Sequence, residues 1–370
     1  MKKYFVLIIG FIIIGVTSGC GDKIDAPTAN TNGEVVLGDT LYIPLSPAWD
    51  AAHDYGFSSP EDVHVGRDTY IYVADTGNDR VIRLDAGGTV LASYTGIPHP
   101  KQITQDELMR LIVINGTRSV YKIDVGPGGD GIPVVCYDAS TPEDSGFISA
   151  SEVFTGVGHY PSINKLYFLS VSSSVTTSGK VVLMEGKGAG DFSDEIMDSV
   201  IASDSDTLYN PVVEYGLGAG YASHPNCLYS FARNDSLFLL MTQDSSTFKA
   251  QLLTIRLLYN TTYGFRSAFN PSGNVDMYEL DFFIQPEDAC VDVGGNIYIV
   301  DAGISAPYGA YKFNSKGELK ESFGPPGNDS DELSNPMGIA YDDNNDRKTV
   351  YIADTGNNRI VRYKLNTDLE

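Results

Sequence analysis

Positive charge is scarce in this sequence. The 25 Lys and Arg residues stand against 48 Asp and Glu residues, which gives a formal net charge of −23. No block of Lys or Arg interrupts this acidity, so a nucleic-acid-binding surface is excluded and a well-solvated surface is the plain interpretation. The chain still has 370 residues, 42% of them hydrophobic, and this is enough apolar material for a sizeable core.

Familiar catalytic signatures are also missing. The sequence contains no Gly-x-Ser-x-Gly turn, no His-Glu-x-x-His helix, no phosphate-binding glycine loop and no Cys-x-x-Cys pair. Cysteine is rare, with four residues in all. If Cys20 is set aside, Cys136, Cys227 and Cys290 allow one disulfide at most, and the sequence does not choose the pair.

The long apolar run Tyr4–Val16 follows Lys2 and Lys3. It is too short to span a bilayer comfortably and is typical of the core of a signal peptide. We therefore expect residues 1–19 to be a signal peptide. Residues 20–33 are small, polar and rich in Pro and Gly, as a flexible tether would be.

The segment Thr17–Cys20, TSGC, resembles a bacterial lipobox, although Thr17 stands where that motif prefers Leu. The resemblance implies cleavage before Cys20 and lipidation of its thiol; the alternative is ordinary secretion with a free Cys20. We expect an exported protein that is lipid-anchored to the cell envelope. The outer membrane of a Gram-negative bacterium, on its periplasmic or surface face, is the expected location.

A short sequence motif near the start of the chain is repeated near its end. The stretches DTGNDRVIRLD (Asp75–Asp85) and DTGNNRIVRYK (Asp354–Lys364) each follow a strand-like run. The first copy predicts short strands at 63–65, 70–74, 81–84 and 90–94, which are joined by turn residues and so are antiparallel neighbours. Further copies begin at Pro100, Pro286 and Pro336, and two degenerate copies fill the middle, giving six units of roughly 50 residues each.

The first and last units resemble NHL repeats, in which a strand, the pattern Asp-x-x-Asn-x-Arg and a second strand follow one another. The resemblance implies an all-β fold, a six-bladed β-propeller with four antiparallel strands per blade, over residues 34–370. The last copy holds only three strands, so we expect the segment 35–46 to pair as its outer strand and close the ring. Structural roles in the turns are expected for Asp75, Asn78, Arg80, Asp354, Asn357 and Arg359.

One set of residues on the inner strands suggests a metal site. When the six innermost strands are aligned, the position expected to face the central channel holds His64, Thr104, His159, Ser230, Cys290 and Ala340. His64, His159 and Cys290 fall in alternate blades, and three protein ligands with one open position are the arrangement of catalytic zinc. The peptide-amidating lyase, an NHL-type propeller, is similar in holding an axial zinc through three histidines. The competing interpretation is that these side chains fill the channel.

Two loops are candidates for binding. The loop 46–57 holds Trp49, His53 and Tyr55, which would form a stacking platform at the rim or cover the end of the ring. The segment 203–226 is too long for a plain turn, and long loops on rigid scaffolds often carry recognition. Its candidate binding residues are Tyr209, Tyr215, Tyr221 and His224.

Two functions from different classes follow. The first, which we expect, is a monomeric, lipid-anchored propeller without enzymatic activity that binds a protein or glycan through its rim loops. The second is a metal-assisted lyase or hydrolase with zinc in the channel, the one cofactor that the sequence suggests. The fold does not decide between them, because propellers host many functions.

Overall fold

The computed structural model describes residues 40–140, 148–159, 166–176, 178–186, 197–199, 212–234, 236–258, 262–273 and 275–369. Thr40–Glu370 forms one compact unit, and it is this unit that we describe. The expected signal peptide, the tether, Cys20 and Tyr209 lie outside the described residues. In the described part of the chain no helix has the length and apolar character needed to cross a bilayer.

The described strands form six sheets of four antiparallel strands each, as the sequence predicts. Each of the first three sheets is built from consecutive strands. Blade one contains β2 (Pro60–Val65), β3 (Ile71–Asp75), β4 (Arg80–Leu84) and β5 (Val90–Thr95); blade two contains β6 (Gln102–Gln105), β7 (Arg110–Ile114), β8 (Ser119–Asp124) and β9 (Val134–Asp138); blade three contains β10 (Glu152–His159), β11 (Leu166–Ser173), β12 (Gly179–Gly186) and β13 (Met197–Ser199).

The other three sheets follow the same plan, except that the last takes its outer strand from the start of the unit. Blade four contains β14 (Pro225–Arg233), β15 (Ser236–Gln243), β16 (Ala250–Leu258) and β17 (Thr262–Ser267); blade five contains β18 (Pro286–Val291), β19 (Ile297–Asp301), β20 (Ala310–Phe313) and β21 (Leu319–Phe323); blade six contains β22 (Pro336–Asp342), β23 (Thr349–Asp354), β24 (Arg359–Leu365) and β1 (Tyr42–Pro44). Short 3-10 helices lie in the connections: η1 (Ala51–His53), η2 (Thr76–Asn78), η3 (Asp276–Tyr278), η4 (Asn344–Asp346), η5 (Thr355–Asn357) and η6 (Asn366–Asp368).

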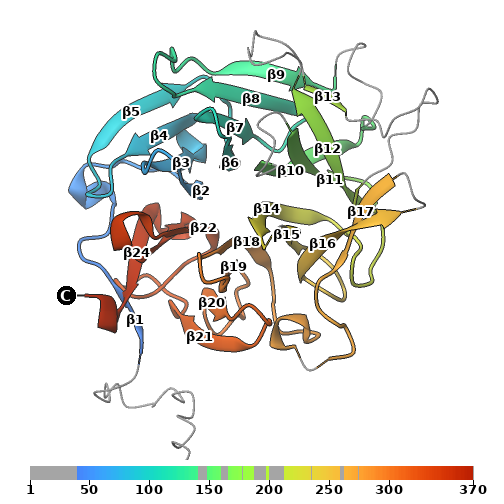
Figure 1. Ribbon diagram of the computed structural model, residues 1–370. Coiled ribbons are helices and arrows are strands. Elements are labelled where there is room, and N and C mark those ends of the chain that lie inside the picture. The colour runs from blue at the N-terminus through green and yellow to red at the C-terminus, as the bar shows by residue number, and fades with distance from the viewer. Residues whose placement is uncertain are drawn as a thin grey trace, which may run out of the picture. The chain divides into compact units, whose positions relative to one another are not determined.

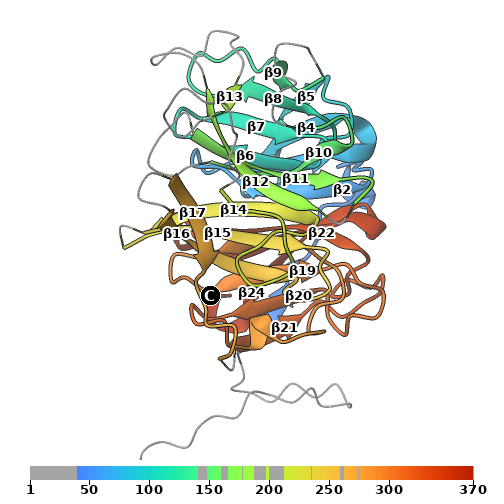
Figure 2. The same ribbon diagram turned by 90° about the vertical axis from the view of Figure 1, so that its right-hand side faces the viewer.

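The sheets surround a common axis, with β2, β6, β10, β14, β18 and β22 innermost (Figure 1). Figure 2, turned by 90°, shows the strands running broadly along that axis. The ring closes as the sequence predicts, because β1 pairs antiparallel with β24 and Ile43 lies opposite Lys364. The loop after β1 continues the closure: Trp49 and Ile360 exchange two backbone hydrogen bonds of 3.0 Å each.

The core lies between blades. Six clusters of buried apolar residues are found in the described part of the chain, and each is made from the facing sides of two neighbouring blades. This follows from strand geometry, because successive side chains point to opposite faces of a sheet and both faces of a blade are covered. The cluster between blades six and one includes Trp49, Phe57 and Tyr351.

All three described cysteines, Cys136, Cys227 and Cys290, are buried and unbridged. The single disulfide that their number allows is therefore not formed among them. Burial raises the pKa of the Cys136 thiol to about 12. Burial also raises the pKa values of Cys227 and Cys290, and the charge of Asp288 adds to both shifts.

Five of the six inner strands have a β-bulge near their start. In four of them the pairing register shifts after the first residue, for example between Pro60 and Asp62 in β2 and between Pro286 and Asp288 in β18, and in β10 it shifts between Phe154 and Gly156. A bulge leaves one residue out of the ladder and re-aims its side chain. The residues left out are Glu61, Thr155, Asn226, Glu287 and Met337.

Candidate functional site

The axis of the ring holds a series of connected cavities. One, of about 230 Å³, lies at the starts of the inner strands. A second, also about 230 Å³, follows along the strands and shares Asp62, Gln102 and Asp288 with the first. A third, of about 430 Å³, lies at the strand ends and shares Arg67 and Tyr229 with the second. Strand starts gather at one end and strand ends at the other, so the six inner strands run in the same direction.

The first cavity is lined by the five bulge residues and by Lys101, which stands at the equivalent place in blade two. We call this set the acidic mouth: Glu61, Lys101, Thr155, Asn226, Glu287 and Met337. The ammonium of Lys101 lies 3.3 Å from Glu61 Oε2. Glu287 Oε1 accepts a hydrogen bond of 2.5 Å from Gln285. Each blade thus contributes one side chain to a polar opening.

Glu287 has an unusual ionisation at this mouth. Burial raises its pKa to about 7; the Gln285 hydrogen bond and Lys101 act against this shift, and the charges of Glu61 and Asp288 add to it. The side chain nevertheless keeps part of its surface open. A carboxylate that is half protonated near neutral pH inside a cavity has the property that general acid–base catalysis needs.

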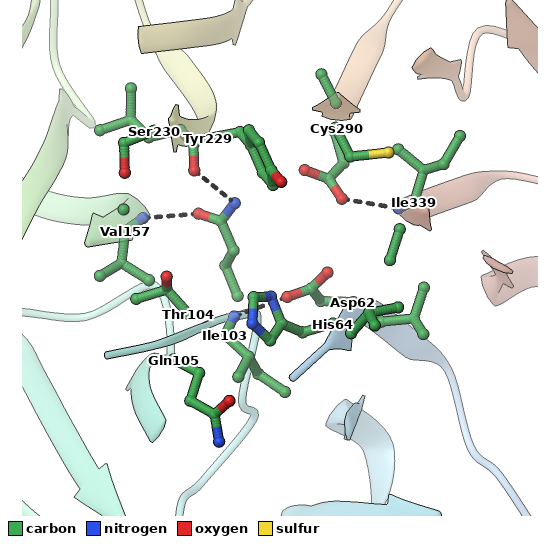
Figure 3. A pocket seen from close by; sticks show the side chains of 18 of the residues that line it. Asp62, His64, Ile103, Thr104, Gln105, Val157, Tyr229, Ser230, Cys290 and Ile339 are labelled. Carbon is green, nitrogen blue, oxygen red and sulfur yellow. Dashed lines mark hydrogen bonds between the residues drawn. The ribbon is translucent and has the colours of Figure 1, made fainter. Parts of the chain in front are cut away.

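Behind the mouth lies a neck formed by the next residue of each inner strand, namely Asp62, Gln102, Gly156, Cys227, Asp288 and Gly338. Three of these side chains accept a hydrogen bond of 2.7 Å from a backbone N–H of the following blade: Asp62 from Ile103, Gln102 from Val157 and Asp288 from Ile339. Figure 3 shows these three bonds around the cavity. The neck therefore joins the blades side by side at the axis.

Glycine completes the neck where two blades approach most closely. A β-carbon at Gly338 would lie 2.6 Å from Asp62 Cα, and one at Gly156 would lie 2.8 Å from Leu228 N. Both distances are shorter than atoms tolerate, so a larger residue would push the blades apart. Two buried carboxyls lie in this neck, and their ionised forms are destabilised there. Burial raises the pKa of Asp62, and the charge of Asp288 raises it further. Burial raises the pKa of Asp288 to about 6.

The second cavity, which we call the chamber, is where the sequence places the channel-facing residues, and all six line it. Counted from the bulge, however, the equivalent positions are His64, Thr104, Gly158, Tyr229, Cys290 and Ala340. The alignment was therefore wrong by one residue in blades three and four. A slip of one residue turns a side chain to the other face of its sheet. His159 accordingly is 4% exposed and contacts the ring of Tyr167.

The predicted zinc ligands do not assemble into a metal site. Among the described residues, which include all three ligands, no group of three or more His, Cys, Asp or Glu side chains is placed to hold a metal ion. Figure 3 shows His64 and Cys290 on different sides of the chamber. Burial lowers the pKa of His64 to about 4, an effect that nearby Arg67 strengthens. His64 is thus a neutral imidazole at neutral pH.

The first predicted binding loop does not offer a stacking platform. Trp49 is only 1% exposed, packs on Tyr351 and lies under the guanidinium of Arg362. Tyr55 stacks between Trp49 and Phe57. His53 is exposed and its Nδ1 lies 2.7 Å from Asp50 Oδ1. The loop packs at the boundary between blades six and one, whereas the alternative that the sequence left open was cover for the end of the ring.

The described residues of the second predicted loop are tied to the scaffold. The Tyr215 hydroxyl donates to Glu152 Oε1 at 3.0 Å. His224 Nε2 lies 3.0 Å from the Ser173 carbonyl oxygen. Tyr221 is exposed on the surface.

The repeated turn residues form matching hydrogen-bond sets. Asp75 accepts from the backbone N–H of Ser58 and from Asn78 and Arg80, at 2.8, 2.8 and 2.6 Å. Asp354 accepts in the same way from Ser334, Asn357 and Arg359, at 2.7, 2.8 and 2.7 Å. Each set fixes the turn between the second and third strands to the loop that enters the blade.

The residues of the acidic mouth were not recognised from the sequence. A signal was present, because Pro60-Glu61-Asp62 and Pro286-Glu287-Asp288 repeat the same three residues at the starts of two blades. Sequence reasoning treated this tripeptide only as a mark of the repeat. The bulge, which turns Glu61 and Glu287 to the axis and the following aspartates to the next blade, is visible only in the structure.

No protein-family model matches the sequence, and no curated protein matches it. Solved structures with a similar fold include a gluconolactonase from Xanthomonas campestris, with 15% identity and a TM-score of 0.53 over 89% of this chain and 90% of that one. A luciferin-regenerating enzyme has 11% identity and a TM-score of 0.53, over 87% and 95% of the two chains. The calcium-binding protein regucalcin from Agrobacterium tumefaciens has 10% identity and a TM-score of 0.52, over 83% and 90%.

These comparisons identify a six-bladed β-propeller that resembles gluconolactonase and regucalcin-type propellers. At such low identity the likeness concerns the fold alone. Activity must therefore be argued from the residues along the axis.

Proposed function

We propose that this protein is an enzyme, a hydrolase of small lactones, and that its reaction takes place at the acidic mouth. The observation that carries the proposal is Glu287, a carboxyl with a pKa of about 7 that is partly open to a cavity shared with Lys101. Lactones are the proposed substrate class because one neighbour in fold is a gluconolactonase. Of the two functions expected from the sequence, the enzymatic one thus receives more support than the binding module, but without the zinc that the sequence suggested.

Each catalytic step uses a group present at the mouth. Glu287 in its ionised form accepts a proton from water, and the water oxygen attacks the lactone carbonyl carbon. The carbonyl oxygen becomes an oxyanion, which the ammonium of Lys101 stabilises. The ring C–O bond then breaks, and the leaving alkoxide takes the proton back from Glu287. The product is an open hydroxy acid, and the carboxylate of Glu287 is restored.

Calcium, which one structural neighbour binds, does not fit this mouth as it stands. Calcium takes six to eight oxygen ligands. The cavity is lined by the carboxylates of Glu61 and Glu287 and by those of Asp62 and Asp288, which already accept backbone hydrogen bonds. Lys101 places a positive charge 3.3 Å from Glu61. Nor do the described residues contain a group of three or more His, Cys, Asp or Glu side chains placed to hold a metal. No step of the proposed reaction uses a metal.

The test measures hydrolysis of D-glucono-δ-lactone and γ-butyrolactone with a pH indicator, using protein that starts at Gly21. We expect kcat/KM to rise with pH through an apparent pKa of about 7, the value given for Glu287. Glu287→Gln should lower kcat by about 100-fold or more, the usual range for loss of a general base. Glu318→Gln, the same change at an exposed site of blade five, should leave the rate unchanged.

Lys101→Met gives an independent readout. The charge of Lys101 lowers the pKa of Glu287, so its removal should move the rate profile to higher pH as well as lower kcat. Hydrolysis of neither lactone by the wild-type protein, or full activity in Glu287→Gln, would overturn the proposed function.

The sequence also motivates proposals about where the enzyme works. The lipobox-like TSGC supports lipidation of Cys20 after removal of residues 1–19, which would tether residues 34–370 to the cell envelope, as expected for an outer-membrane lipoprotein. The paired hydrogen-bond sets of Asp75 and Asp354 support an NHL-type repeat. We expect the wild-type protein to partition into the Triton X-114 phase and the Cys20→Ser variant to remain in the aqueous phase. Equal partition of both proteins would contradict lipidation.

A protein or glycan partner at the rim loops, bound by a monomer, receives less support than the proposed hydrolase. Among the described loop residues, Trp49 is buried, and Tyr215 and His224 are engaged in contacts with the scaffold.

A further inference from the structure

The third cavity, at the opposite end of the axis, has the features of a second ligand site. Its volume of about 430 Å³ is in the range of small-molecule sites. It is lined by the ends of the inner strands of blades one, four, five and six. We call it the arginine mouth, after the members that matter here: Arg67, Arg233, Tyr229, Phe231, Tyr341 and Asp343.

Two arginines at this mouth have no protein partner for their charge. In the described part of the chain, neither Arg67 nor Arg233 forms an ion pair or a side-chain hydrogen bond, and both are exposed. By contrast, Arg80, Arg110, Arg347 and Arg359 each pair with an aspartate. Arg266 on β17 also forms no ion pair within the described residues, so the feature particular to Arg67 and Arg233 is that both line one cavity. Their planar donors match a carboxylate well.

Local structure places both arginines at the mouth. The backbone N–H of Arg67 donates to Gln105 Oε1 at 2.6 Å, which fixes the turn after β2. The Arg233 side chain lies against Gly295, where an added β-carbon would be 2.0 Å from its Nη1. Arg67 is also close enough to Tyr229 to lower the pKa of that hydroxyl, against the larger effect of burial. Arg67 lines both the chamber and the arginine mouth, so it lies where the two cavities adjoin.

Aromatic rings and hydrogen-bond acceptors complete the lining. Tyr229 and Phe231 lie with ring centroids 6.2 Å apart, and Tyr341 stacks on Tyr298 at 5.3 Å. Such rigid rings offer flat apolar surfaces. Asp292 also lines this cavity, but its carboxylate already accepts hydrogen bonds from Asn296 and Tyr298. Asp343 makes no side-chain bond within the described residues and can accept from ligand hydroxyls.

We propose that the arginine mouth binds a uronic acid, with the sugar carboxylate on Arg67 and Arg233, the ring against the aromatic side chains and a hydroxyl on Asp343. A sugar acid is the ligand class that satisfies the unpaired cations, the apolar faces and the remaining carboxylate together. The site lies at the other end of the axis from Glu287. It is independent of the proposed lactone hydrolysis.

The test is isothermal titration calorimetry at low salt with D-galacturonate and D-glucuronate, and with D-galactose and D-glucose as neutral analogues. We expect the uronates to bind at least about tenfold more tightly than the neutral sugars, and added NaCl to weaken them. Arg67→Gln combined with Arg233→Gln should weaken uronate binding by about tenfold or more. The control Arg266→Gln removes one positive charge from the exposed outer strand of blade four and should bind as the wild type does, and each single variant at Arg67 or Arg233 is its charge-matched comparison.

Equal binding of uronates and neutral sugars, no uronate binding by the wild type, or unchanged binding by the double variant would each overturn the proposal. Benzoate that binds as tightly as the uronates would also overturn it, because the site would then not select a sugar. Asp343→Asn should weaken the uronates and leave benzoate unchanged. Lactone hydrolysis by the double variant should equal that of the wild type, which separates the two proposals.

Discussion

The Cys227 thiol donates a hydrogen bond to Asp288 Oδ1 at 2.6 Å, across the boundary between blades four and five. The other oxygen of Asp288 accepts from the Ile339 N–H of blade six at 2.7 Å. One buried carboxyl thus joins three consecutive blades beside the axis. It does so with its pKa raised to about 6 by burial, so its ionised form is stabilised less in the folded chain than in the unfolded chain.

Stability should therefore fall as pH rises from about 4.5 to 7. Asp288, Glu287 and Glu321 have folded pKa values of about 6, 7 and 7, raised mainly by burial from values near 4. In this window the unfolded chain loses these protons first, which lowers the free energy of unfolding by on the order of 1 kcal/mol per group. Calorimetry should give a higher Tm at pH 5.5 than at pH 8; a Tm that rises over this range would contradict the assignment.

Two substitutions at Asp288 should separate its hydrogen bonds from its charge. Asp288→Ala leaves the Ile339 N–H and the Cys227 thiol without their acceptor, and should cost about 1–3 kcal/mol. Asp288→Asn keeps an acceptor and removes the buried charge, so it should be nearly as stable as the wild type at pH 8 and less dependent on pH. Urea titrations at pH 5.5 and 8 measure both effects; equal losses in the two variants would mean that the charge itself stabilises the neck.

Gly338→Ala should destabilise the ring. The added β-carbon would lie 2.6 Å from Asp62 Cα, a backbone atom of blade one that cannot turn away. Overpacking of this kind costs about 1–3 kcal/mol. Gly87→Ala is the control, because its β-carbon would meet only the Asp85 side chain, at 3.2 Å, and little change in stability is expected. Equal unfolding midpoints for the two variants would show that the blades can separate freely at the neck.

The three buried thiols should be unreactive in the folded protein. Burial raises the pKa of Cys136 to about 12 and raises those of Cys227 and Cys290, so little thiolate is present at pH 8. Protein that starts at Gly21 should show no fast reaction with Ellman's reagent, and three thiols in urea. Fewer than three thiols in urea would indicate a disulfide.

Trp49 should be required for closure of the ring. Trp49→Ala removes a side chain that is 1% exposed and packs between blades six and one, so a loss of about 3–5 kcal/mol is expected. His53→Ala, in the same loop, removes an exposed side chain and should change stability by less than about 0.5 kcal/mol. Urea unfolding followed by circular dichroism compares them. A minor effect of Trp49→Ala would return this residue to the set of candidate binding residues.

The sequence by itself determined the blades and their closure. The pattern of Asp75, Asn78 and Arg80, repeated at Asp354, Asn357 and Arg359, specifies a turn between two strands through contacts among residues close in sequence. The missing fourth strand of the last unit likewise identified β1 as its outer strand, because a sheet edge left open in a ring must be paired.

Only the tertiary structure decided which side chains face the axis. In β10 a bulge between Phe154 and Gly156 shifts the register, and Gly156 and Gly158 supply no large side chains to mark the alternation. The sequence alignment was therefore one residue out at His159, although this residue does line the chamber. The same kind of bulge directs the side chains of Glu61 and Glu287 into one cavity, the acidic mouth. Arg67 and Arg233 line the same cavity at the other mouth although 165 residues separate them in sequence. Such placements depend on a one-residue register and on how the blades join around the ring, and local sequence specifies neither.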